Sequence, residues 1–458
     1  MADPRAHSPI TELNHLDELL RQCVQCGLCL PHCATWLATG NEVQSPRGRL
    51  LLLGEMIRSS GTETDTNATP NAFLQAFDEC IGCRACETAC PSGVPFSLLE
   101  YGQLRAAEIP PHRLDLPVPA VPGAVLRRMD QPGFLEFLSQ VAGLVRGVLT
   151  LVAGKTWRRR LDRGPAGTGR LVRLLGSLPT SPRSDAELVR MLDGLCGRET
   201  QRRNGLPHDV ALGASDNPSA GPRVAFFRGC ANSGLLSDTS RRFRDLLSAS
   251  GCRLEEPAAQ DCCGALATHT GRPGRSADLR RRNRDVFAGA LNEGTVIVAE
   301  AAGCSHELKE YGDEFRTGVV DAVVLLAGLD LPPLGSVPLR VAYHDPCHAR
   351  HGQGIVDEPR MLLTAIPGLE IVEPIEPEVC CGSGGAWGLR YPELSDELGR
   401  RKAADLAATG ADLVVTSNPG CLGQIADGLR VIAPDVPILP LTDLLWYAVL
   451  IRIDSTRS

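Results

Sequence analysis

Four short apolar runs in the second half of the chain each end at a cysteine. They are RVAFFRGC (223–230), TVIVAEAAGC (295–304), LRVAYHDPC (339–347) and DLVVTSNPGC (412–421). Their valine and isoleucine content favours buried strands. Helical patterns lie between them, as at 237–250 and 392–409, each followed by a glycine. This alternation predicts α/β units around parallel sheets, with the cysteines at the carboxyl ends of strands, where such sheets bind ligands.

The same half of the chain contains an internal repeat of four cysteines. The first set recurs 117 or 118 residues later, a glycine follows each adjacent pair, and a glycine precedes each last cysteine. Matching spacing at this many positions indicates a duplicated domain, and we expect one copy at 223–335 and one at 336–450. The repeated positions are Cys230, Cys262, Cys263 and Cys304, followed by Cys347, Cys380, Cys381 and Cys421.

Two functions of these eight cysteines stay open at the level of sequence. Adjacent cysteines point in diverging directions, and both reach one centre only on a tight turn, which the following glycine permits. The eight positions are therefore candidates for a metal, cluster or redox site, while packing of small buried thiols is the alternative. A single histidine is more often a core or surface residue, so the sequence assigns no role to His269, His306, His344, His348 or His351.

The first hundred residues carry two cysteine runs of another kind. CVQCGLCLPHC (23–33) and CIGCRACETACP (80–91) both follow C-x2-C-x2-C-x3-C. This spacing is typical of two-cluster ferredoxins, in which the fourth cysteine of each run binds the other cluster. Structural zinc, the alternative, is usually held by two separated cysteine pairs. The spacing predicts two [4Fe–4S] clusters, one bound by Cys23, Cys26, Cys29 and Cys90, and one by Cys80, Cys83, Cys86 and Cys33.

Helical sequence at 49–59 and 71–78 separates the two runs. It favours a helical two-cluster domain at 1–105 over a compact β-rich ferredoxin. Cys196 falls outside both patterns, and we interpret it as a structural thiol.

A connecting region is expected at 106–222. Residues 121–183 contain eleven Arg and Lys against three Asp and Glu, and the stretch 134–154 is mostly apolar. This stretch is either an amphipathic helix on a membrane surface or a helix packed on the domains with a solvated basic end. Residues 200–222 are rich in Gly, Pro, Ser and Asn and indicate a linker.

Composition narrows the classes of function. The chain has 458 residues, 43% of them hydrophobic, 4% aromatic, and a formal net charge of −7, which argues against nucleic-acid binding. We see no signal peptide and no run of about 18 apolar residues, so we expect a cytoplasmic protein. In that compartment its eighteen cysteines favour metal or redox chemistry over disulfides.

Taken in order, these motifs resemble the iron–sulfur subunit of glycolate oxidase (glycolate dehydrogenase). The resemblance covers nearly the whole chain, including SPRGR at 45–49, KEYG at 309–312 and CCGSGG at 380–385. It implies an α/β multidomain fold, with a helical ferredoxin-like domain before two cysteine-rich domains. It also implies that an FAD-containing partner oxidises glycolate to glyoxylate. This chain would then pass electrons towards a quinone or membrane acceptor, which would place it at most peripherally on the inner face of the membrane.

The resemblance leaves alternatives open and assigns no catalytic residue to this chain. Iron–sulfur subunits of lactate and glycerol-3-phosphate dehydrogenases are similar, and the repeat resembles the catalytic subunit of heterodisulfide reductase. In that enzyme the repeat ends in C-x2-C, whereas Ser-His-Glu follows Cys304 and Leu-Gly-Gln follows Cys421 here. The missing fifth cysteine weakens the expectation of thiol–disulfide catalysis. A zinc-holding scaffold without redox activity is the third alternative.

Overall fold

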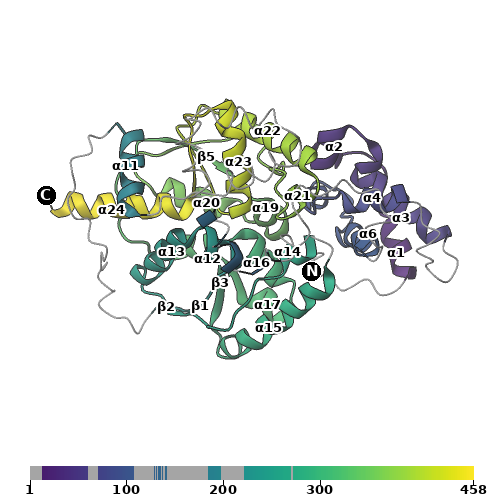
Figure 1. Cartoon of the computed structure of the whole chain (residues 1–458), viewed down its shortest axis with the longest axis horizontal. Helices are drawn as coiled ribbons and strands as arrows, with labels where there is room; N and C mark the ends of the chain where they lie inside the picture. The colour runs from purple at the N-terminus through teal and green to yellow at the C-terminus, as the bar shows by residue number, and fades with distance from the viewer. Residues whose placement is uncertain are drawn as a thin grey trace.

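The computed structural model describes residues 13–59, 71–107, 184–197, 221–269 and 272–457, with a few positions between 128 and 141. The apolar stretch expected at 134–154 and the linker expected at 200–222 lie almost wholly outside the described residues. The described parts form a helical N-terminal lobe and two α/β units, drawn from purple to yellow in Figure 1.

The N-terminal lobe comprises the described residues between 13 and 107. Single turns of 3-10 helix at Leu30–His32 and Glu42–Gln44 connect its helices. The helices are α1 (Leu13–Leu20), α2 (Ala34–Thr39), α3 (Pro46–Ser59), α4 (Asn71–Asp78), α5 (Ala85–Thr88) and α6 (Ser97–Ala107). Helices α3 and α4 confirm the helical sequence expected between the two cysteine runs.

A small core holds this lobe together. Leu53, Phe77 and Leu98 are fully buried in it. Helix α6 approaches α4 so closely that a Cβ on Gly102 would lie 2.2 Å from the Phe77 ring, so only glycine fits there. The buried Arg49 side chain joins α3 to both neighbours: its Nε donates to the Ala76 carbonyl at 2.6 Å and its Nη1 to Thr35 Oγ1 at 3.1 Å. These contacts set the positions of the segments that carry the cysteine runs.

The first α/β unit, here called the first repeat, has a four-stranded parallel sheet. The strand order is β2 (Arg253–Glu255), β1 (Arg223–Phe227), β3 (Val296–Ala299) and β4 (Val319–Asp321). Its helices are α12 (Cys230–Leu235), α13 (Ser237–Ala249), α14 (Ala265–His269), α15 (Pro273–Asn292), α16 (Ala302–Lys309), α17 (Asp313–Gly318) and α18 (Ala322–Ala327). Strand β1 has β2 on one side and β3 on the other, so the chain crosses over β1 on its way from β2 to β3. The carboxyl ends of β1 and β3 therefore form a switch point that suits ligand binding.

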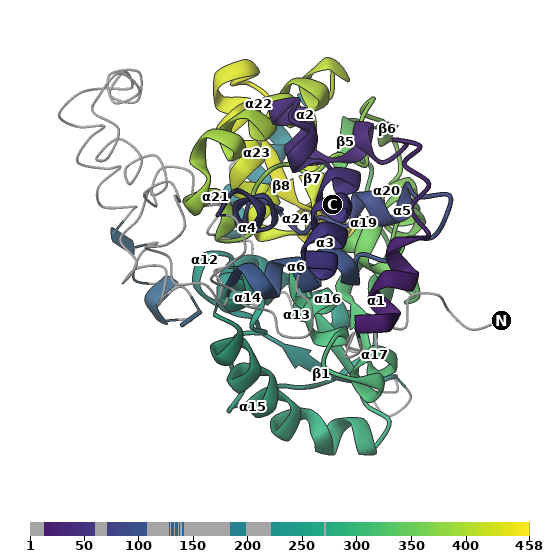
Figure 2. The same ribbon diagram turned by 90° about the vertical axis from the view of Figure 1, so that its right-hand side faces the viewer.

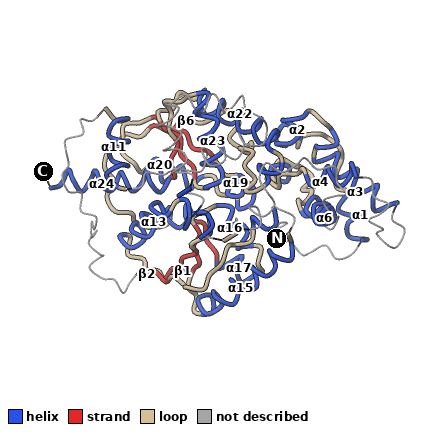
Figure 3. Tube along the Cα trace, viewed as in Figure 1, coloured by secondary structure: helices blue, strands red, loops and turns tan. Residues whose placement is uncertain are grey.

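The second repeat has the same topology. Its order is β6 (Glu370–Val372), β5 (Arg340–His344), β7 (Leu413–Thr416) and β8 (Ile438–Pro440), again all parallel. Its helices are α19 (Cys347–Gln353), α20 (Asp357–Thr364), α21 (Trp387–Arg390), α22 (Pro392–Ala408), α23 (Pro419–Ile432) and α24 (Leu441–Arg457). The two red sheets of Figure 3, each surrounded by helices, are these two units. The α/β fold with parallel sheets is as the sequence predicts.

One hydrophobic core is shared by both repeats. Phe226 and Leu246 of the first repeat belong to it together with Val341 and Trp446 of the second. Helix α11 (Asp185–Leu195) packs on α24 in the same core. The N-terminal lobe lies across one end of this pair of units and faces the viewer in Figure 2. The three parts of the described chain are therefore in contact, which brings their cysteine motifs near one another.

Candidate cluster and cysteine sites

The two C-x2-C-x2-C loops share one backbone conformation. Residues in the left-handed region occupy the same two places in each loop: Gln25 (φ 57°) and Gly27 (φ 81°) in the first, Gly82 (φ 73°) and Arg84 (φ 62°) in the second. Gln25 and Arg84 carry side chains, so each costs about 1–2 kcal/mol in that region. The same strained backbone recurs in both loops although the glycine occupies a different one of the two places. This indicates that the shape itself is required, as it is in a loop that surrounds a ligand. It suits a loop that wraps one face of a cluster.

The second loop encloses a cavity. Four cysteines line it, Cys80, Cys83 and Cys86 from the loop and Cys33 from the first run. The other lining side chains include Ile81, Phe96 and Leu99, and burial raises the pKa of the Cys80, Cys83 and Cys86 thiols. Four thiols in an apolar cavity are costly as free thiolates and are well suited as iron ligands. The residues present therefore fit a [4Fe–4S] cluster.

The first loop lies nearer the surface. Cys26 is exposed, while Cys23 and Cys29 are half-buried. Cys23 packs on the core of the N-terminal lobe, as does Cys90 from the second run. Burial, with a smaller contribution from nearby Cys33 and Cys23, raises the pKa of Cys29 to about 11. Cys80 and Cys86 pack on the same core, so cysteines of both runs meet there.

The second loop docks on the second repeat. Cys83 and Ile81 share a hydrophobic cluster with Cys380 and Trp387, and Cys347 packs against it. The proximity of Cys347 also contributes, after burial, to the raised pKa of Cys83. The predicted second cluster site is thus adjacent to two cysteines of the repeat, an arrangement that the sequence did not indicate.

Histidines complete this junction. His348 Nε2 lies 3.3 Å from the Gly82 carbonyl oxygen, and His351 Nδ1 lies 2.7 Å from Thr88 Oγ1. On the side of the first repeat, His306 Nε2 is 3.3 Å from an Arg84 nitrogen. These three histidines, set aside at the level of sequence, therefore connect the cluster loop to both repeats.

The four cysteines of the first repeat come together in two pairs. The sulfur atoms of Cys230 and Cys262 are 3.5 Å apart, and those of Cys263 and Cys304 are 3.4 Å apart. Hydrogen bonding from the adjacent Cys262 raises the pKa of the Cys263 thiol, so the two pairs form one group, and Gly264 after them has a φ of 97°. The topology explains the gathering, because β1 and β3 are neighbours and their carboxyl ends lead to Cys230 and Cys304.

The second repeat has a different arrangement. Cys347 and Cys380 sulfurs are 3.9 Å apart, and Gly382 has a φ of 84°. The ligand atoms of Cys381, Cys421 and His344, all buried, lie within 4.8 Å of one another. Burial lowers the pKa of His344 to about 3, which keeps its imidazole neutral. The sequence places all four cysteines at this centre, but it does not single out His344.

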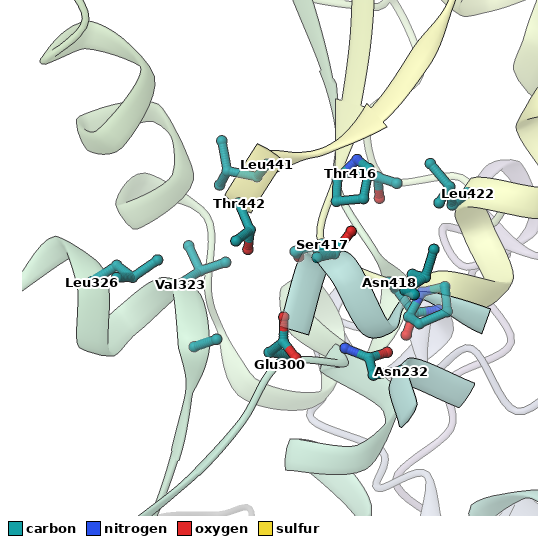
Figure 4. A pocket seen from close by; sticks show the side chains of 15 residues that line it. Asn232, Glu300, Val323, Leu326, Thr416, Ser417, Asn418, Leu422, Leu441 and Thr442 are labelled. Carbon is teal, nitrogen blue, oxygen red and sulfur yellow. The ribbon is translucent and has the colours of Figure 1, made fainter. Parts of the chain in front are cut away.

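A pocket lies between the carboxyl ends of the two sheets (Figure 4). Glu300 follows β3, Asn232 lies in α12, and Asn418 follows β7. Asn418 Nδ2 donates to the Cys421 sulfur at 3.4 Å, and its Oδ1 accepts from the Gly303 amide at 3.3 Å. The pocket therefore borders a cysteine of the second repeat and the backbone beside Cys304 of the first.

Two cysteines have structural surroundings. Cys196 follows α11 and accepts a long contact of 3.9 Å from the Tyr447 hydroxyl, in keeping with a structural thiol. Cys252, which the sequence patterns do not include, is buried at the end of α13. In the described ranges, no helix is long and apolar enough to cross a membrane.

Comparison with known families agrees with this architecture. Residues 19–94 match the 4Fe-4S dicluster domain, and residues 224–309 and 341–426 each match the cysteine-rich domain known as CCG. Fold and sites thus define an iron–sulfur protein of the electron-transfer class, with iron–sulfur clusters as its cofactors.

Relatives identify the family within that class. The "Probable glycolate oxidase iron-sulfur subunit" of Bacillus subtilis (strain 168) is 31% identical over 94% of this chain and 94% of its own. The "Glycolate oxidase iron-sulfur subunit" of Escherichia coli (strain K12) is 26% identical over 90% of this chain and 91% of its own. "Lactate utilization protein A" of Oceanobacillus iheyensis is 29% identical over 49% of this chain and 96% of its own. The chain belongs to the family of glycolate oxidase iron–sulfur subunits.

Proposed function

We propose that this chain is the electron-transfer subunit of a glycolate dehydrogenase. A flavoprotein partner oxidises glycolate to glyoxylate, which releases two electrons and two protons. The two [4Fe–4S] clusters that its cysteines would hold would let this chain take the electrons one at a time and pass them towards a quinone, which would take up two electrons and two protons. The observation that carries the proposal is the contact of Cys83 with the Cys347 and Cys380 region, because it connects the ferredoxin-type lobe to the repeats.

The ligand sets are part of the proposal. Cys80, Cys83, Cys86 and Cys33 hold the inner cluster, supported by the cavity that all four line. Cys23, Cys26, Cys29 and Cys90 hold the outer cluster, supported by the matching backbone of the two loops. The four segments expected from the sequence, 1–105, 106–222, 223–335 and 336–450, are proposed with the same bounds.

The order of the relay follows from exposure. Cys26 is exposed, and Val24 and Leu28 beside it are 68% and 56% exposed. Large apolar side chains around an accessible thiolate suit a surface that a redox partner covers. We therefore place the flavoprotein at the first loop. The outer cluster would then receive the electrons first, and the inner cluster, beside the second repeat, would receive them next.

Lactate is the second candidate substrate of the partner. The likeness to Lactate utilization protein A supports it, and that likeness covers nearly the whole of the relative. The substrate site lies on the partner in either case, so the two candidates predict the same chemistry in this chain.

The decisive experiment uses the complex of this chain with its flavoprotein partner, purified anaerobically. Glycolate should reduce the clusters, seen as low-temperature EPR signals, and should support reduction of a soluble quinone analogue. Lactate and glycerol 3-phosphate at equal concentration are the comparison substrates. If lactate reduces the clusters and glycolate does not, the substrate of the partner is lactate rather than glycolate. Absence of iron and sulfide from the purified chain would overturn the relay itself.

A further inference from the structure

A group of three buried side chains in the second repeat is suited to a single metal ion. His344 is the last residue of β5, Cys421 lies in the first turn of α23 after β7, and Cys381 is the second of the adjacent cysteines, directly before the turn at Gly382. Strands β5 and β7 are hydrogen-bonded neighbours, so their carboxyl ends bring His344 and Cys421 to one place. The three ligand atoms lie within 4.8 Å of one another.

The state of His344 is the independent sign of a ligand. Its side chain is 1% exposed, and neither ring nitrogen has a hydrogen-bond partner in the structure. A buried polar group without a partner costs about 1–3 kcal/mol, so it needs an explanation. A nitrogen that faces two thiols is explained by a metal ion between them.

We propose that His344, Cys381 and Cys421 bind one zinc-class divalent cation, in a mononuclear site separate from the two N-terminal clusters. Two thiolates and one imidazole form a donor set that zinc prefers. Bond lengths of about 2.0–2.3 Å around a tetrahedral ion place its ligand atoms about 3.5–3.8 Å apart, which a small contraction of this group reaches. The two thiolate charges balance the ion, so the buried site is neutral. The fourth position is open to water, which keeps this charge balance.

The first repeat lacks this donor set. The position equivalent to His344, 117 residues earlier, is Phe227, which is buried and packs on Phe287 with ring centres 6.0 Å apart. The thiols there pair with one another, at 3.5 and 3.4 Å. The duplicated units have therefore diverged at a strand end, and the nitrogen ligand is present only in the second. This difference supplies the control for the test, which does not depend on the partner or its substrate.

The test is metal analysis of the full chain purified anaerobically. Wild-type protein should contain about one zinc in addition to its iron, and His344→Phe, which copies the first repeat, should lose at least about five-sixths of that zinc. Cys421→Ala should lose it as well, while its counterpart in the first repeat, Cys304→Ala, should keep it. Far-UV circular dichroism shows that each variant is folded, and iron is measured separately. After exchange with Co²⁺, the visible absorption of tetrahedral thiolate-bound cobalt should appear in wild type and Cys304→Ala and be absent from His344→Phe.

Three results would overturn the proposal. The first is wild-type protein without zinc that takes up no Co²⁺. The second is loss of iron and sulfide, rather than zinc, from a folded His344→Phe variant, which would assign a cluster to these residues. The third is equal loss of zinc from Cys304→Ala, which would assign the ion to the first repeat.

Discussion

The indole Nε1 of Trp387 donates a hydrogen bond to the backbone carbonyl oxygen of Glu79 at 3.2 Å. Glu79 directly precedes Cys80, the first cysteine of the second cluster loop, and Trp387 begins α21 in the second repeat. A residue of the repeat thus fixes the backbone at the entrance of the loop. The same junction includes an ion pair of Arg390 with Asp78 at 2.5 Å. The geometry of the inner cluster site therefore depends on docking of the lobe.

Replacing Trp387 should separate loss of the hydrogen bond from loss of packing. Trp387→Phe removes the Nε1 donor from a buried carbonyl together with part of the ring volume, and we expect a loss of about 1–3 kcal/mol in the free energy of unfolding. Trp387→Ala also empties a buried site and should cost about 3–5 kcal/mol. Urea unfolding monitored by far-UV circular dichroism measures both losses, because this signal does not rely on tryptophan fluorescence. Equal stability of the alanine variant and wild type would show that the junction does not hold the lobe.

Cysteine variants test the ligand sets. Cys83→Ser and Cys26→Ser should each remove one cubane, lowering iron and acid-labile sulfide by about half, because each deletes one of four thiolates. Quinone-linked turnover of the complex should fall by at least about tenfold in both, since each interrupts a serial relay. Cys196→Ser is the matched control, because Cys196 lies far from both loops in sequence and contacts α24. Full iron content with unchanged EPR spectra in both loop variants would contradict the assignment.

Much of the site follows from local sequence. The strands that precede Cys230, Cys304, Cys347 and Cys421 are apolar runs, and periodicity suffices to find them. The tight turns after the adjacent cysteines follow from Gly264 and Gly382. These predictions succeed because each depends only on residues that are neighbours in the sequence.

Other features depend on contacts between distant residues. The strands β2 and β6 have three residues each and partly polar sequences, so no apolar run marks them. His344 is an ordinary strand residue by pattern, and its two unpartnered nitrogens appear only in three dimensions. The pairing of Trp387 with Glu79 joins residues 308 positions apart. Local sequence patterns therefore cannot predict that the N-terminal lobe docks on the second repeat.

A buried ion pair between the repeats gives a stability prediction. Arg242 of α13 lies 3.0 Å from Asp443 of α24, and both side chains are 0% exposed. Arg242→Met leaves the Asp443 charge buried without this partner, and we expect a loss of about 3–5 kcal/mol. Arg241→Met is the control: Arg241 also pairs with Asp185, but it is 36% exposed, so the loss should stay below about 1 kcal/mol. Similar urea midpoints for the two variants would show that burial of the pair does not matter.

Glu300, beside the pocket between the repeats, should make stability depend on pH. Burial raises the pKa of Glu300 from 4.5 to about 7, against the opposing hydrogen bonds from Ser240 and Asn232. Between these two pH values the unfolded chain has lost a proton that the folded chain keeps, so the free energy of unfolding falls as pH rises through this window. The full effect is about 3 kcal/mol, and it is complete above about pH 7.

Glu300→Gln should remove this dependence, because glutamine keeps the polar shape of the side chain and never ionises. We expect the variant to be about 1–3 kcal/mol more stable than wild type at pH 8, with the difference closing towards pH 4, where both side chains are neutral. Urea unfolding at several pH values measures the difference. Glu307→Gln should behave in the same direction, since burial raises the pKa of Glu307 to about 7 as well. A Glu300→Gln variant that is less stable than wild type by the same amount at every pH would mean that the carboxylate stays ionised in the folded protein.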